Sequence, residues 1–147
     1  MQIERCTSAD DESWLALRNE LWPDVSNAEH RQEVDDLLRD GYRYAVFLCR
    51  AATGDAMGFA EVSLRSDYVN GCGAGPVAFV EGIFVRGEHR RKGVARRLCS
   101  AIESWARERD CTELASDVAF SNLLSQRVHA ALGFEATERV IFYRKQL

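Results

Sequence analysis

The sequence predicts an α/β fold in which a mixed, largely antiparallel sheet carries helices on both faces and holds one parallel strand pair at its centre. Two observations support this prediction. Strand-like segments follow one another between residues 44 and 85 without room for a crossover helix, which makes them antiparallel neighbours. Between residues 77 and 117, a strand, an amphipathic helix and a second strand follow in order, which requires a parallel pair. The crevice at the ends of that pair is the expected ligand site.

The N-terminal part of the chain is expected to form one short strand and two helices. A strand over residues 2–6 leads to a capping region over residues 8–11, and the helix that follows carries apolar residues at helical spacing. Pro23 ends this helix, because proline disfavours helical geometry in the residue before it. A second helix is expected over residues 28–39.

The rest of the chain alternates strands and helices. Val94, Leu98 and Ile102 lie at helical spacing after the central strand, and Gly133 suits the end of the last helix, where a positive φ is common. The expected elements, in chain order, are strands over residues 44–50, 57–65 and 77–85, a helix over 94–108, a strand over 113–117, a helix from 122 to 133 and two closing strands.

The composition indicates a single domain over residues 1–147. The 147 residues are 46% hydrophobic and 29% charged, which is enough to bury a core and too few for two typical domains. No apolar run approaches the roughly 18 residues that cross a bilayer, and the first residues lack the apolar stretch of a signal peptide, so a cytoplasmic location is expected. The net charge of -4 argues against nucleic-acid binding.

The cysteines and histidines do not predict a metal site. The five cysteines form no C-x-x-C, and the three histidines have no metal-ligand spacing among themselves or with cysteine. Odd in number and mostly within predicted strands and helices, the cysteines are expected to be buried, reduced thiols. Cys72 is the exception, because the glycine-rich loop over residues 71–75 would expose it.

A basic, glycine-bearing turn joins the central strand to the next helix. Backbone N–H groups at a helix N-terminus lack partners within the helix and favour an anion. Gly93 lets the backbone approach that anion closely, while Arg90, Arg91 and Lys92 add positive charge, so a pyrophosphate is the expected ligand. The alternative is a charged turn with a solvated face. Neither G-x-x-x-x-G-K-[ST] nor G-x-G-x-x-G occurs, which argues against a nucleotide triphosphatase or a Rossmann dehydrogenase.

Two segments share a resemblance to one superfamily. Arg90-x-x-Gly93-x-Ala95 resembles the R/Q-x-x-G-x-G/A pattern of the GCN5-related N-acetyltransferases, whose loop binds the pyrophosphate of acetyl-coenzyme A (acetyl-CoA). The helix that starts near Asn122 and ends at Gly133 is similar to the second cofactor segment of that superfamily. The resemblance implies an N-acetyltransferase fold in which the two parallel strands splay apart, with the pantetheine of the cofactor between them.

Three carboxylates are candidates for binding an amine and taking up its proton. An amine must lose a proton before its lone pair can attack a thioester, and a carboxylate near the splay can accept it. Glu81 lies in an apolar strand, where its charge is costly unless it faces a cavity or a cation. Asp117 ends the second parallel strand, and Glu138 begins the last one. An ion pair or cap is the structural alternative for each, and Asp117 could cap the following helix.

Longer segments narrow the resemblance to one family. Residues 21–23, 67–72, 79–85, 115–117, 129–134 and 138–145 together resemble the aminoglycoside 6′-N-acetyltransferases of the chromosomal type. This resemblance implies an aminoglycoside site lined by Trp22, Tyr68, Glu81, Asp117 and Glu138. It implies a coenzyme A site formed by Ile83, Phe84, Val85, Arg90, Arg91, Lys92, Gly93, Val94, Ala95 and Asn122. It also implies a homodimer in which Tyr68 reaches the partner's site.

The expected reaction is direct attack of the 6′-amine of an aminoglycoside on acetyl-CoA in a ternary complex, which would confer antibiotic resistance. Asp117 or Glu81 would accept the proton, and a strand N–H near Ile83 would stabilise the developing oxyanion. Many superfamily members have a tyrosine seven residues after the helix asparagine, whereas this chain has His129 there. His129 is therefore a candidate for the group that protonates the leaving thiolate, with a structural hydrogen bond as the alternative.

Two other functions fit the same residues. A polyamine or a protein amine would also suit an acidic groove with the same cofactor. A catalytically idle acetyl-CoA sensor would need only the basic turn, and the presence of all three carboxylates argues against it. The segment over residues 24–30 departs from the family pattern beside the acceptor site, so the preferred drug stays open.

Overall fold

A computed structural model describes residues 1–147 and shows a five-stranded sheet in the order β1-β2-β3-β4-β5. β1 pairs with β2, β2 with β3 and β3 with β4 in antiparallel fashion, whereas β4 and β5 are parallel, which confirms the mixed sheet that the sequence predicts. The predicted central position of the parallel pair is wrong, because no strand follows β5 in the sheet and the pair therefore lies at its edge. The strands are β1 (Gln2–Arg5), β2 (Tyr44–Arg50), β3 (Ala56–Arg65), β4 (Val77–Val85) and β5 (Leu114–Ser116).

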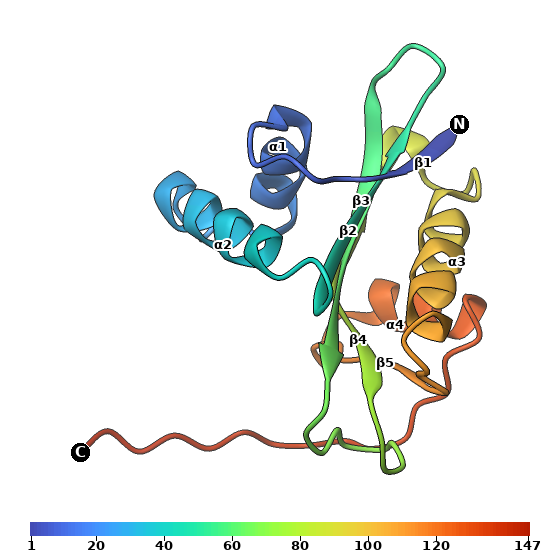
Figure 1. The fold of residues 1–147 in the computed structure, drawn as a ribbon. Coiled ribbons are helices and arrows are strands. Elements are labelled where there is room, and N and C mark those ends of the chain that lie inside the picture. The colour runs from blue at the N-terminus through green and yellow to red at the C-terminus, as the bar shows by residue number, and fades with distance from the viewer.

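Helices cover both faces of the sheet, as Figure 1 shows. The helices are α1 (Glu12–Leu21), α2 (Asn27–Arg39), α3 (Val94–Arg107) and α4 (Leu123–Ala131), with a short 3-10 turn over Gly87–His89. The first two lie against one face, and α3 lies against the other, where α4 also lies (Figure 1). None of these helices has both the length and the apolar character that crossing a membrane requires.

Two apolar clusters fill the space between these layers. On one face, Leu98, Ile102 and Trp105 of α3 pack against the middle of the sheet. On the other face, Trp14 and Leu17 of α1 join buried residues of α2 and the sheet. Both helices present their apolar residues at the spacing that predicted them, so the two clusters account for the position of the helices.

Capping residues fix where the helices begin. The Asp11 carboxylate accepts hydrogen bonds from the first N–H groups of α1, and Ser26 forms a reciprocal capping box with Glu29 at the start of α2. Asn122 caps α4 by accepting from the N–H of Ser125 at 3.1 Å. The helix boundaries therefore follow local chemistry that is readable in the sequence.

A β-bulge interrupts β4 at Glu81. Val80 pairs with Val62 and Gly82 pairs with Glu61, which leaves Glu81 as the extra residue whose backbone has no paired residue on β3. Pairing between β4 and β5 extends only from Ala78 to Val80, so the parallel ladder ends at the residue before the bulge. Beyond this point the two strands are no longer hydrogen-bonded, and the bulge lies where they part.

The prediction of two closing strands at the C-terminal end is wrong. Residues 135–147, here called the arm, form no strand and make no backbone hydrogen bond. The arm first passes the body, where Thr137 lies against Gly71 and the Arg139 guanidinium lies over Phe120, 5.4 Å from its centroid, and then extends away from it, drawn in red in Figure 1. Val140, Ile141, Phe142 and Tyr143 supply the strand-like pattern, but they lie exposed along the arm. A strand forms only beside another strand with free N–H and C=O groups, and the arm runs along no such edge of its own chain.

Candidate active site

A cavity of about 220 Å³ opens where β4 and β5 separate. Its walls come from the end of α1, the bulged part of β4, the loop after β5 and one side of α4. Its lining residues are Leu21, Trp22, Val80, Glu81, Gly82, Ile83, Ser116, Asp117, Val118, Ala119, Asn122, Ser125 and His129. The cavity thus holds two carboxylates, an imidazole and an aromatic wall at the crevice that the sequence predicts.

Glu81 enters this cavity as a paired anion. Arg65 Nη2 lies 3.0 Å and 3.2 Å from its two carboxylate oxygens, and the hydroxyl of Ser63 donates to one of them. The Arg65 guanidinium also stacks over the Phe79 ring, 3.5 Å from its centroid. Both members of the ion pair are partly exposed, so Glu81 lies at the wall of the cavity with a cation beside it.

Asp117 differs from Glu81 in having no partner. It follows β5 directly and is exposed at the cavity, and no hydrogen bond or ion pair within the chain reaches its carboxylate. The alternative role as a helix cap is excluded, because Asn122 holds the capping position of α4. Asp117 is therefore a free carboxylate at the carboxyl edge of the parallel pair.

Trp22 forms a rigid aromatic wall. Its backbone N–H donates to the Arg18 carbonyl at 2.8 Å, and its ring meets Phe59 edge-on with centroids 6.0 Å apart. The ring lies so close to β4 that a Cβ on Gly82 would come within 2.6 Å of it. Gly82 therefore provides the space in which the indole sits, and the guanidinium of Arg18 packs over the indole, 4.8 Å from its centroid.

His129 projects from α4 toward the end of β5. Its Nε2 atom lies 2.9 Å from the Ser116 hydroxyl oxygen, and its Nδ1 atom lies 2.8 Å from the Ser125 carbonyl oxygen. The ring also meets Phe134 edge-on, with centroids 5.2 Å apart. These contacts fix the orientation of the imidazole at the wall of the cavity.

The basic turn presents an open helix N-terminus. Gly93 is the N-cap of α3 in the left-handed conformation with φ +80°, and no side chain caps the first N–H groups of this 14-residue helix. No acidic residue lies in the first turn, while Arg91 and Lys92 are exposed beside it. Arg90 turns back and donates through Nε to the Val85 carbonyl at 3.0 Å, which ties the turn to the end of β4. Such free N–H groups with flanking cations fit a pyrophosphate.

The structure brings together only part of the predicted site. Trp22, Glu81, Asp117 and His129 line one cavity, as do Ile83 and Asn122 of the predicted coenzyme A residues. The other predicted coenzyme A residues, Phe84, Val85 and Arg90 through Ala95, lie beyond the cavity along β4 and the start of α3. Two predicted acceptor residues are absent from the cavity. Tyr68 is 77% exposed in the loop between β3 and β4, and Glu138 lies on the arm.

Sequence reasoning missed three polar residues of this region. Ser116 ends the second parallel strand, and its position at the carboxyl edge was the available signal. Arg65 and Ser63 lie on β3, and they reach Glu81 only because the bulge sets the register between β3 and β4. No local pattern in the sequence shows that register.

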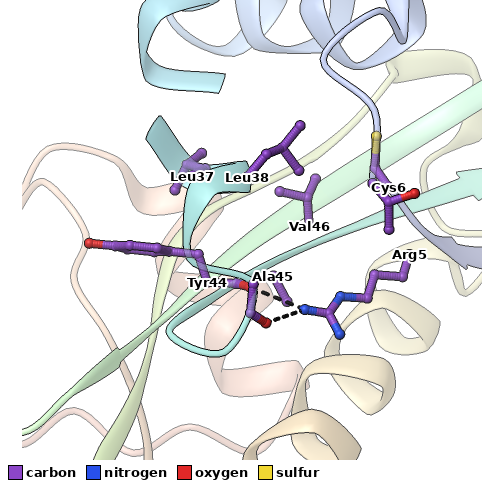
Figure 2. A pocket seen from close by; sticks show the side chains of 9 residues that line it. Arg5, Cys6, Leu37, Leu38, Tyr44, Ala45 and Val46 are labelled. Carbon is purple, nitrogen blue, oxygen red and sulfur yellow. Dashed lines mark hydrogen bonds between the residues drawn. The ribbon is translucent and has the colours of Figure 1, made fainter. Parts of the chain in front are cut away.

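A second, smaller cavity of about 90 Å³ lies between β1, β2 and the end of α2. Figure 2 shows that Leu37, Leu38 and Val46 form much of its wall. Its one charged group, Arg5, donates to the carbonyls of Gly41 and Tyr44 (Figure 2). With its cation occupied and no carboxylate in the lining, this cavity does not offer the groups that acyl transfer requires.

Comparisons with known proteins agree with this geometry. The model of the acetyltransferase (GNAT) family matches residues 13–134. The chain is 50% identical over 142 residues to an aminoglycoside N(6′)-acetyltransferase type 1 of Serratia marcescens, with 97% of each chain covered. It is 45% identical to a protein of the same name from Salmonella enteritidis, with 99% of each covered.

A solved structure shares the whole fold. The structure of AAC(6′)-Iy in complex with the bisubstrate analogue CoA-S-monomethyl-acetylneamine has a TM-score of 0.93 and 44% sequence identity, covering 99% of this chain and 98% of that one. Taken with the splayed parallel strands, the open helix N-terminus and the carboxylate-lined cavity, these likenesses show that the chain belongs to the GNAT acetyltransferases and, within them, to the aminoglycoside N(6′)-acetyltransferase family.

Proposed function

We propose that this protein transfers the acetyl group of acetyl-CoA to the 6′-amino group of aminoglycosides and thereby confers resistance to them. The observation that carries the proposal is the unpaired Asp117 carboxylate, which lies in one cavity with the Trp22 wall at the point where β4 and β5 part. A polycationic sugar suits an anionic groove with an aromatic wall. Because acetyl-CoA is the cosubstrate, the proposed reaction belongs to the cytoplasm.

The cosubstrate follows β4 to the start of α3. Its pyrophosphate binds the first N–H groups of α3 over residues 90–95, where the helix dipole and the flanking cations favour an anion. Its pantetheine lies along residues 83–85, whose strand has no ladder with β5 beyond Val80. Asn122, at the start of α4, closes the other side of the groove.

Chemistry begins with the acceptor amine. Asp117 binds the 6′-ammonium group and takes its proton, directly or through water, and the neutral nitrogen then attacks the thioester in a ternary complex. Glu81 is already paired with Arg65 and Ser63, and it serves mainly to hold a second cationic group. A backbone N–H of β4 near Ile83 stabilises the oxyanion. His129 supplies the proton for the leaving thiolate.

The complete acceptor site includes a second copy of the chain. Glu138 cannot reach the cavity of its own chain from the arm, and residues 135–147 expose apolar side chains and unpaired backbone. An exposed apolar segment of this kind is a template for pairing with another chain. In the proposed homodimer, the arm of one copy supplies Glu138 and the exposed Tyr68 reaches across to the partner's site.

Light scattering during size-exclusion chromatography tests the homodimer. The full chain is expected to elute with twice the mass of one chain, and a variant truncated after Glu135 is expected to elute with the mass of one. Glu138→Gln keeps the arm and serves as the control, so it is expected to remain dimeric while the KM for the aminoglycoside rises. A full chain with the mass of one copy would contradict the homodimer without affecting the proposed chemistry.

Release of free coenzyme A by the purified protein tests the reaction. An aminoglycoside with a 6′-amine is expected to support turnover, whereas its 6′-hydroxyl counterpart is expected to give none. Polyamines and a lysine-containing peptide are assayed in parallel. Turnover with these amines but not with the aminoglycoside would replace the proposed acceptor by the polyamine or protein amine that the same acidic groove can hold.

A further inference from the structure

The hydrogen bonds of His129 determine which of its ring nitrogens carries a proton. The Ser125 carbonyl oxygen, 2.8 Å from Nδ1, can only accept a hydrogen bond, whereas the Ser125 hydroxyl, 3.3 Å from the same atom, can donate or accept, so the shorter contact assigns the proton to Nδ1. A neutral imidazole has one N–H, which leaves Nε2 as an acceptor. The Ser116 hydroxyl, 2.9 Å from Nε2, therefore donates to it. The resting pair is thus a hydroxyl poised to pass its proton to an imidazole.

Ser116 occupies the position where such a pair is useful. It is the last residue of β5 and the partner of Val80, at the end of the parallel ladder, and it lies beside Asp117 in the lining of the cavity. The order of hydroxyl, imidazole and a fixing acceptor is the arrangement that activates hydroxyl groups in hydrolases, here with a backbone carbonyl in the third place. His129 itself lies one hydrogen bond further from the parted strands.

We propose that Ser116 is a catalytic residue whose hydroxyl relays a proton from the acceptor nitrogen to His129 and back to the leaving sulfur. The inference rests on the proposed function and deepens it. Asp117 alone takes one proton, whereas an ammonium group must lose two to become an amide nitrogen. One of these two must be taken up by a second group, and the thiolate needs one.

Each step of the relay balances. Asp117 accepts the first proton of the ammonium group, and the neutral nitrogen forms the C–N bond as the carbonyl electron pair moves to oxygen. The positively charged nitrogen of the intermediate passes its proton to the Ser116 hydroxyl, whose own proton moves to Nε2 of His129. The oxyanion electron pair re-forms the C=O bond as the C–S bond breaks with its electron pair going to sulfur, and the imidazolium returns the proton through Ser116 to that sulfur. The products are the amide, free coenzyme A and one proton that Asp117 releases to solvent.

One hydroxyl can serve both ends of this transfer. The attacking nitrogen and the leaving sulfur are bonded to the same carbon in the tetrahedral intermediate, so a hydroxyl beside that carbon lies next to both. The reacting carbon belongs in the groove between β4 and β5, and Ser116 marks the point where that groove begins. General acid and base groups contribute rate factors of about 10² to 10⁴.

Steady-state kinetics of Ser116→Ala and Ser116→Thr test the relay, with Ser104→Ala on the exposed side of α3 as the matched control. The alanine variant is expected to lose at least about a hundredfold in kcat, with both KM values within about twofold of the wild type. The threonine variant keeps the hydroxyl and is expected to retain most of kcat. The control is expected to behave as the wild type.

A second measurement separates a relay from a structural hydrogen bond. If Ser116 and His129 act as one unit, the double variant Ser116→Ala with His129→Gln is expected to lose no more in kcat than either single variant. A kcat for Ser116→Ala within about threefold of the wild type would overturn the relay. Equal losses in the alanine and threonine variants would also overturn it, because the hydroxyl would then not matter. A wild-type protein without turnover on any aminoglycoside would instead overturn the proposed function, and the relay with it.

Discussion

Glu61 lies within the sheet and Asp117 directly follows its last strand, and the two carboxylates have opposite surroundings. Glu61, on β3, is 3% exposed, and it accepts hydrogen bonds from Arg18 at 2.6 Å and from the Trp14 indole at 2.8 Å. Asp117, after β5, is exposed in the cavity and has no partner. A buried charge with every partner in place supports the fold, whereas a free charge at a cavity is available to a substrate.

Trp22 contacts both the buried polar residues around Glu61 and the cavity that contains Asp117. The buried Arg18 packs over one side of the indole, and the buried His30 contacts the Trp22 carbonyl through Nε2 at 3.2 Å. The indole also lies against Gly82 and lines the cavity. The buried Arg18 thus pairs with Glu61 and also packs against the indole that lines the cavity.

The largest expected effect comes from breaking the buried pair. Arg18→Ala leaves Glu61 buried without its cation, and we expect the free energy of unfolding in urea to fall by about 3–5 kcal/mol. The double variant Arg18→Met with Glu61→Leu removes both charges and is expected to recover most of that loss. Arg107→Ala, which breaks an exposed pair with Glu103, is the control and should leave the urea midpoint unchanged. A loss in the double variant equal to that of Arg18→Ala would show that the unpaired charge is not the cause.

The next effect comes from removing the free carboxylate. Asp117→Asn keeps the size of the side chain and is expected to lower kcat/KM for the aminoglycoside about a hundredfold or more. Because no partner is lost, the urea midpoint should stay that of the wild type. Glu108→Gln, on the exposed end of α3, is the control for both assays. An unfolded Asp117→Asn protein would place Asp117 in the same class as Glu61.

A smaller effect on the KM for the aminoglycoside is expected from a change at Gly82, which lies against Trp22. Gly82→Ala brings a Cβ within 2.6 Å of the Trp22 ring, so the indole must move. We expect the KM for the aminoglycoside to rise about tenfold while the KM for acetyl-CoA stays unchanged, with a stability loss of about 1–3 kcal/mol from overpacking. Gly87→Ala, with nothing near its Cβ position, is the control. Equal rises in both KM values would show a general distortion of β4 instead of a displaced wall.

The smallest expected effect concerns the thiols, of which four are buried and Cys72 is half-buried. Burial and the Glu103 carboxylate raise the pKa of Cys99 to about 11, so at about pH 8 only roughly one thiol in a thousand is ionised. Burial and Glu113 also raise the pKa of the half-buried Cys72, which is the most accessible of the five. Iodoacetamide is therefore expected to modify Cys72 alone in the folded protein, slowly, and faster as the pH rises. Mass spectrometry of tryptic peptides checks this, and early labelling of Cys99 would contradict its burial.

The sequence was sufficient to predict a structural feature wherever the interactions that determine it are local. The spacing of Leu98, Ile102 and Trp105 predicted α3 almost to the residue, and Pro23 marked the end of α1. The expectation of buried, reduced cysteines is confirmed for four of the five. Local patterns determine such elements because their hydrogen bonds and apolar faces lie within one turn or one strand.

Other features depend on partners far along the chain. The pairing of Glu81 with Arg65 depends on how β3 and β4 are aligned, and the contact of Ser116 with His129 depends on how α4 packs on β5. The arm carries a strand pattern over residues 138–145, but its chain offers it no neighbouring edge. Patterns predict that a segment can become a strand, whereas the partner that completes it is a property of the assembled fold.

The bulge at Glu81 also changes which residues of β4 point toward α3. Before it, Ala78 and Val80 belong to the apolar layer under α3, and after it Ile83 and Val85 do, so the inward positions switch from even to odd numbers. The strand can therefore keep an apolar side toward α3 along its whole length, and only Glu81 at the bulge departs from the alternation. Deleting that one residue would restore unbroken alternation and let β4 continue beside β5. The protein would then keep its layers and lose its groove, so the active site depends on one extra residue in β4.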